Sequence, residues 1–163
     1  MLSLIKAASY IFNRYNAEFN IKIDEMKLHK LLYFSQRECI IMLDEPMFLE
    51  EFHAWKFGPV LVQIRDFYRW NNFTATLTAE EKAIYIPVFD SVFANYAGKS
   101  SWSLSMLSHG EISWQRARIG IPQGANCSTP IKLEDIKADA ERIRLRRFYF
   151  NEILPEIDSA NKC

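Results

Sequence analysis

Residues 26–43, Met-Lys-Leu-His-Lys-Leu-Leu-Tyr-Phe-Ser-Gln-Arg-Glu-Cys-Ile-Ile-Met-Leu, are the stretch that decides the fold. Their apolar residues recur at helical spacing and point in most directions around the helix axis. A helix that is apolar on most sides is buried by its neighbours. Asp24 is placed as the N-cap, and Asp44-Glu45-Pro46 ends the pattern. The stretch therefore predicts a central helix around which the rest of the chain packs.

The remaining sequence is mostly amphipathic at the helical period, with end signals between the segments. Thr78 and Glu81 form a capping-box pair, and Pro87 is expected to kink or split the helix that follows them. Pro59 suits the first turn of a helix. The helices predicted from these patterns cover residues 2–15, 24–43, 59–70, 79–97, 101–107, a turn at 113–118, and 133–150.

Residues 47–57 show a different pattern from the other segments. They are rich in aromatic residues that alternate imperfectly with polar ones. They lie between Pro46 and Gly58-Pro59, which are turn signals. We expect a short strand or a pair of strands here. The fold class predicted is mainly α, a single compact domain over residues 1–163 with a small β element at 47–57.

Composition excludes several functional classes. The chain has 163 residues, and 20 Lys and Arg balance 20 Asp and Glu. The balance is also local, so no basic region offers the phosphate contacts of a nucleic-acid binder. Only five residues are glycine, which argues against glycine-loop nucleotide sites. Three widely spaced cysteines, with neither a leader nor a membrane-length apolar run, predict a cytoplasmic protein without disulfides.

No arrangement of side chains in the sequence indicates catalysis. His29, His53 and His109 lack metal-ligand spacing, and no nucleophile motif is present, so we expect no metal, no cofactor and no enzymatic activity. The arginines of residues 142–147 share a helix with acids at i,i+3, as in Asp139–Arg142 and Glu141–Arg144. A self-paired, solvated face is the favoured interpretation, and an arginine surface for an acidic protein partner stays open.

The segment from Phe52 to Val60 allows two interpretations. It holds Phe52, Trp55, Lys56 and Phe57 within six residues. Aromatic side chains beside a cation are typical of protein-binding hot spots. Large rings that close a small core, with Gly58-Pro59 as a turn, would give the same pattern.

Three ordered blocks resemble the Panacea domain, the family of SocA-like antitoxins and phage-associated GepA-type proteins. The family pattern is Lys-Leu-x-Lys-Leu-Leu-Tyr, then Ala-Trp-x-x-Gly-Pro-Val, then His-x-x-x-x-Trp. Here these are Lys27 to Tyr33, Ala54 to Val60, and His109 to Trp114, and the resemblance covers about residues 5–120. It implies a mostly helical domain with a small β element near the Trp-x-x-Gly-Pro turn.

The resemblance also implies a function without catalysis: binding and neutralising a cognate toxin, usually encoded by an adjacent gene, as in a type II toxin–antitoxin system. Our candidate partner-binding residues are Trp55, Lys56, His109, Trp114 and Arg118. The alternative is a phage or mobile-element interaction module, such as an adaptor for a cytoplasmic protease. A third hypothesis, an enzyme that uses His109 with Glu111 as acid and base, is the least favoured because no nucleophile accompanies them.

Overall fold

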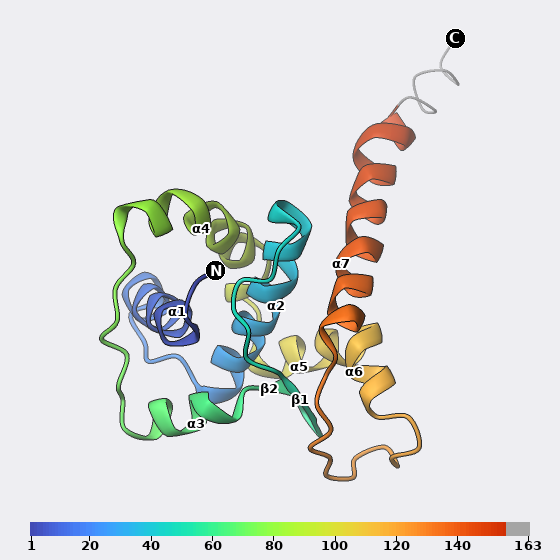
Figure 1. Ribbon diagram of the computed structural model, residues 1–163, viewed down its shortest axis with the longest axis horizontal. Coiled ribbons are helices and arrows are strands. Elements are labelled where there is room, and N and C mark those ends of the chain that lie inside the picture. The colour runs from blue at the N-terminus through green and yellow to red at the C-terminus, as the bar shows by residue number, and fades with distance from the viewer. Residues whose placement is uncertain (156–163) are drawn as a thin grey trace.

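Helix α2 (Glu25–Leu43) lies at the centre of the fold, as its sequence predicts. The computed structural model describes residues 1–155 and shows α2 with α1 and α4 on one side and α7 on the other (Figure 1). Every residue of α2 from Lys27 to Ile40 is buried. The charged side chains of this run, such as Lys30, Arg37 and Glu38, are therefore buried too and need partners inside the fold.

Seven α-helices, one two-stranded sheet and two π-helical turns make up residues 1–155. Caps expected from the sequence are present: Asp24 Oδ1 accepts from the Lys27 amide at 2.8 Å, and Thr78 and Glu81 form the reciprocal capping box. The remaining elements are α1 (Leu4–Phe19), β1 (His53–Trp55), β2 (Gly58–Val60), α3 (Val62–Arg69), α4 (Ala79–Val92), η1 (Phe93–Ala97), α5 (Ser101–His109), α6 (Ile112–Ala117), α7 (Leu133–Phe148) and η2 (Tyr149–Ile153).

The mainly α fold with a small β element is confirmed, but the β element is shorter and shifted. Strands β1 and β2 pair antiparallel through a turn at Lys56 and Phe57. Residues 47–52 are not part of a strand, and the side chain of Gln36 occupies backbone groups of the first two of them. It accepts from the amides of Met47 and Phe48 and donates to the Phe48 carbonyl.

The prediction that Pro59 opens the third helix is wrong. Pro59 lies in β2 opposite Ala54, and α3 begins only at Val62. The turn into β2 depends on Gly58, whose φ of 103° is a conformation that side chains disfavour. Pro87 does not split α4, which runs through it from Ala79 to Val92.

The apolar core joins side chains from α1, α2, α4, α5, α7 and the hairpin. Cys39 is a buried core residue, as expected, and Cys127 is also a free thiol, whereas Cys163 lies outside the described residues. Helix α7 packs along α2, and its last turns extend beyond the rest of the fold (Figure 1). Of the helices formed by residues 1–155, none combines the length and apolar character required to cross a membrane.

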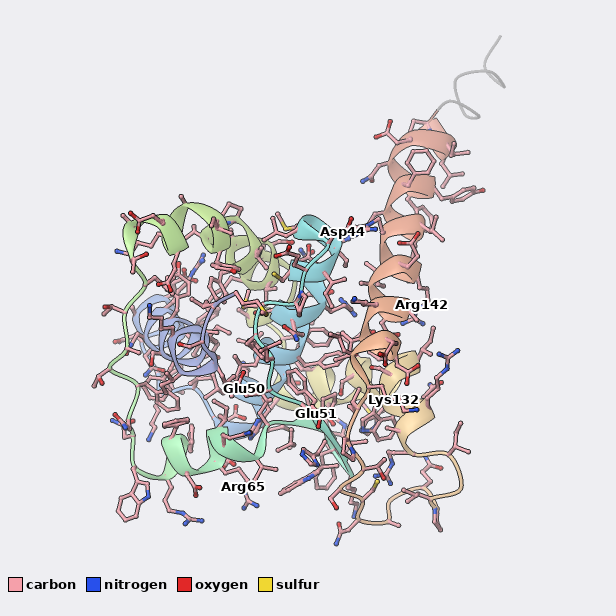
Figure 2. The ribbon with its side chains drawn as sticks, viewed as in Figure 1. Asp44, Glu50, Glu51, Arg65, Lys132 and Arg142 are labelled. Carbon is pink, nitrogen blue, oxygen red and sulfur yellow. The ribbon has the colours of Figure 1, made fainter. Side chains whose placement is uncertain are left out.

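The arginines of α7 are largely paired with acids, as the sequence indicates. Figure 2 shows Asp44 at the end of α2 beside α7, where Arg144 reaches it at 2.7 Å. Arg144 also pairs with Glu141, and Arg142 pairs with Asp139. Arg147 makes two hydrogen bonds to the buried carboxylate of Glu38. The pairs within α7 are as predicted, whereas the contacts with Asp44 and Glu38 attach α7 to α2, so this face is not solely a solvated, self-paired one.

Candidate functional site

The three motif blocks meet at the turn between β1 and β2. A Cβ atom placed on Gly58 would clash with Ser108 Oγ on α5 and lie 2.7 Å from Lys30 Cε on α2. Only a glycine permits this approach of the backbone, and its positive φ requires a glycine for a second reason. Gly58 is therefore the point at which the hairpin packs directly against both α2 and α5.

Trp114 connects the third block to the hairpin. Its indole Nε1 donates to the Trp55 carbonyl at 3.0 Å, and its ring stacks on His109 with centroids 4.1 Å apart. The guanidinium of Arg118 lies 5.0 Å from the same ring and donates to the Ala54 carbonyl at 2.9 Å. Burial lowers the pKa of His109, so this imidazole is neutral at pH 7.

The structure brings the five sequence-predicted partner-binding residues into one region, but with different exposure. Lys56 is exposed at the tip of the hairpin, and Trp55, His109 and Trp114 are half-buried. Arg118 is buried and holds backbone carbonyls of Ala54 and Ala125. Its side chain therefore supports this region from inside and is not part of the exposed surface.

The exposed surface at this region includes aromatic residues that were not selected from the sequence. Phe57 at the hairpin tip and Trp102 in the first turn of α5 are 43% and 59% exposed, with ring centroids 6.1 Å apart. Met106, one turn further along α5, is also exposed. Trp102 lies outside the three blocks, so only the packing of α5 against β2 reveals that it belongs here.

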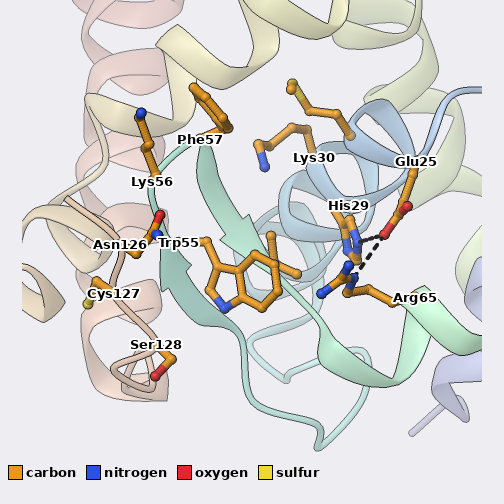
Figure 3. A pocket seen from close by; sticks show the side chains of 12 residues that line it. Glu25, His29, Lys30, Trp55, Lys56, Phe57, Arg65, Asn126, Cys127 and Ser128 are labelled. Carbon is orange, nitrogen blue, oxygen red and sulfur yellow. Dashed lines mark ion pairs between the residues drawn. The ribbon is translucent and has the colours of Figure 1, made fainter. Parts of the chain in front are cut away.

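A pocket of about 730 Å³ lies beside the hairpin, between α2, α3 and the loop at 126–128. Figure 3 shows Lys30 directed into the space between Phe57 and Trp55, with Glu25, His29 and Arg65 on one side. The sequence signal for Lys30 is a basic residue within a helix that is apolar on most sides. The lining residues are Glu25, Met26, His29, Lys30, Trp55, Lys56, Phe57, Val60, Arg65, Asn126, Cys127 and Ser128.

Burial dominates the electrostatics of this pocket. It lowers the pKa of Lys30 to about 7, against a weak opposing effect of Asp24. It also lowers the pKa of His29, although the nearby Glu25 carboxylate opposes this. His29 Nδ1 accepts the Leu61 amide at 3.3 Å, so a neutral His29 carries its proton on Nε2, 3.5 Å from Glu25.

A buried polar cluster lies where α2, α7 and the start of α6 meet. Arg37 donates to Glu111 at 2.5 Å, and Tyr33 donates to Asp139, which also accepts from the amides of α6. Burial raises the pKa of Glu111 to about 7; Arg37 opposes this shift and Asp139 adds to it. The Glu111 carboxylate is thus directed to Arg37, whereas His109 stacks on Trp114.

Among residues 1–155, no group of three or more His, Cys, Asp or Glu side chains is arranged to hold a metal ion.

Comparison with known proteins identifies the family. The sequence model described as antitoxin SocA-like, Panacea domain, matches residues 28–115. This range contains the central helix from Leu28 onward, the hairpin, α3, α4, and α5 with the start of α6. The chain belongs to the SocA-like antitoxin family with a Panacea domain. Neither the curated proteins nor the solved structures contain a match.

Proposed function

We propose that this protein is an antitoxin that acts in the cytoplasm and neutralises a cognate toxin by stoichiometric binding, without catalysis, as in a type II system. Membership of the SocA-like family supports an antitoxin-like role and a protein partner. The observation that carries the proposal is the exposed contact between Phe57 and Trp102 beside Lys56. Exposed aromatic side chains next to a cation are the typical centre of a protein interface.

The hairpin surface, defined as Lys56, Phe57, Trp102 and Met106, has a rigid support. The Trp114–Trp55 hydrogen bond and the tight packing at Gly58 fix the turn against α5 and α2. A rigid surface loses little conformational entropy on binding, so more of the contact energy contributes to affinity. This is what inhibition by occlusion of a toxin requires.

The test is co-expression with the adjacent gene, scored by growth. A toxic neighbour whose effect this protein suppresses supports the proposal. The double variant Phe57→Ser/Trp102→Ser is then expected to lose suppression while its circular dichroism and melting temperature stay close to wild type. Trp70→Ser is the matched control, because Trp70 is 76% exposed at the end of α3. Suppression that survives the double variant contradicts the hairpin surface, and a neighbour without toxicity contradicts the antitoxin role.

A second candidate function, a phage-associated interaction module or protease adaptor, is favoured by one further surface. Leu145 and Phe148 at the end of α7 and Phe150 in η2 are each more than half exposed. An adaptor requires two separate surfaces, one for its cargo and one for the protease. Degradation of the partner that requires both Phe57 and Phe148, with partner binding lost only in the Phe57 variant, would support this function over simple neutralisation.

A further inference from the structure

The pocket beside the hairpin contains a buried lysine amine that lacks a carboxylate partner. Lys30 is 1% exposed, and its Nζ donates to the Pro59 carbonyl at 3.0 Å. No ion pair within residues 1–155 includes it. An ammonium group transferred from water to such a site is costly unless an anion accompanies it. Glu25, the one acid among the pocket residues, already lies 3.5 Å from both Arg65 and His29.

One further polar atom of the lining lacks a partner. Nε1 of Trp55 is buried and makes no hydrogen bond within the described chain. The neutral ring of His29 carries its proton on Nε2, because Nδ1 accepts from Leu61, and this Nε2 lies 3.5 Å from the Glu25 carboxylate. Unsatisfied buried donors are uncommon in folded proteins, and a water, an ion or a ligand can supply the missing acceptor.

The lining includes four apolar side chains, two of them flat aromatic rings. The rings of Trp55 and Phe57 lie on either side of the Lys30 amine (Figure 3), and Met26 and Val60 also line the pocket. Lys56 and Arg65 add positive charge at the mouth, and Arg65 lies 5.0 Å over the Trp55 ring. A volume of about 730 Å³ is within the range that holds a small organic molecule.

We infer that this pocket binds a small organic carboxylate, whose anionic group pairs with Lys30 and whose flat apolar body lies against Trp55 and Phe57. One buried ammonium matches the single charge of a carboxylate, whereas a phosphate dianion would need more donors to offset its loss of hydration. The same chemistry exists in a free aromatic acid and in a peptide that ends in an aromatic residue. This inference does not depend on the antitoxin role.

The experiment is a titration of the ¹⁵N-labelled full-length chain, followed at the indole Nε1–H resonance of Trp55, which Trp55→Phe assigns. The probes are 3-phenylpropionate, indole-3-acetate and the peptide acetyl-Gly-Phe with a free carboxylate. Each is compared with its uncharged primary amide. We expect at least one acid to shift the Trp55 signal saturably and to bind about tenfold or more tighter than its amide. Binding by the free acids alone identifies a metabolite site, and binding by the peptide alone identifies a chain-terminus site.

Lys30→Met is expected to weaken binding of the acid about tenfold or more and to leave binding of the amide unchanged. Lys27→Met is the matched control: Lys27 is a buried lysine of the same helix, but its amine contacts Tyr15 and Ala97 outside the pocket. Equal binding of acid and amide, unchanged acid binding in Lys30→Met, or no saturable shift up to about 10 mM of any acid would overturn the inference.

A measurement on the wild-type protein keeps the test valid if Lys30→Met does not fold. With Lys30 as the partner, acid affinity should fall as pH rises above about 7, because the amine loses its proton. Constant affinity between pH 6 and 9 would contradict this. The other charged or titratable groups around the amine are Asp24, Glu25 and His29 from α2, Lys56 from the hairpin, Arg65 from α3, and His109 from α5. Suppression of the adjacent gene's toxicity is a separate measurement. The carboxylate pocket and the antitoxin role can therefore each be refuted independently of the other.

Discussion

The indole nitrogen of Trp114 donates a 3.0 Å hydrogen bond to the backbone oxygen of Trp55, and this contact joins residues 59 positions apart in the sequence. It attaches α6 to the hairpin and holds the turn that carries Lys56 and Phe57. Trp55 and Trp114, which the sequence suggests as partner-binding residues, are therefore joined to each other. Their hydrogen bond fixes the backbone of the hairpin turn next to the exposed residues.

Trp114→Phe removes this hydrogen bond and leaves a partly buried carbonyl without its donor. We expect a loss of about 1–3 kcal/mol in the free energy of unfolding, measured by urea denaturation. Trp102→Phe, a change at an exposed tryptophan of α5, is the control and should stay within about 0.5 kcal/mol of wild type. Equal effects of the two changes would show that the Trp114 bond contributes nothing specific.

Gly58→Ala should destabilise the fold by more than about 1 kcal/mol, because the new Cβ meets Ser108 and Lys30 at a φ of 103°. Gly98→Ala is the matched control. Gly98 has a φ of −73° and nothing within 4 Å of an added Cβ. The control should leave the melting temperature unchanged or raise it, and a Gly58→Ala variant as stable as this control would refute the close packing of the turn.

Glu111 predicts a pH dependence of stability. Its pKa is raised from 4.5 to about 7 in the folded state, so the folded protein keeps a proton that the unfolded chain releases. Stability from this group is fully present below pH 4.5 and is lost as pH rises to about 7. The unfolding free energy of wild type minus that of Glu111→Gln should therefore fall across this window and level off above it.

Urea denaturation at four pH values between 4.5 and 8 measures that difference. Glu134→Gln, a change at an exposed acid of α7, provides the control and should show no comparable slope. A difference for Glu111→Gln that increases with pH would mean that Arg37 keeps the carboxylate ionised in the folded state.

Arg147→Met should loosen α7 from α2. The change removes two hydrogen bonds from Glu38, whose side chain is 1% exposed, and leaves Ser91 as its one hydrogen-bond partner among residues 1–155. We expect a loss of about 1–3 kcal/mol in unfolding free energy, together with faster amide exchange in α7. The neighbouring Arg146→Met should change stability by less than about 0.5 kcal/mol, since Arg146 is exposed and contacts Phe150.

Local patterns sufficed to predict most helices, because helical periodicity and capping act over a few residues. The buried run of α2, the Asp24 cap and the Thr78–Glu81 capping box are as predicted. The family also follows from sequence, since its motif is a set of short blocks. The start of α3 was not predictable in this way, because Pro59 fits both a helix start and an edge strand.

The sequence by itself determined a mainly helical fold around one central helix and the family to which the chain belongs. Only the tertiary structure decided that Arg118 is buried, that Phe57 and Trp102 share an exposed surface, and that Lys30 points into a pocket. Each of these depends on side chains from distant segments meeting around α2. Periodicity sets which face of a helix is apolar, but the packing of helices against one another sets which polar groups lose water and which remain exposed.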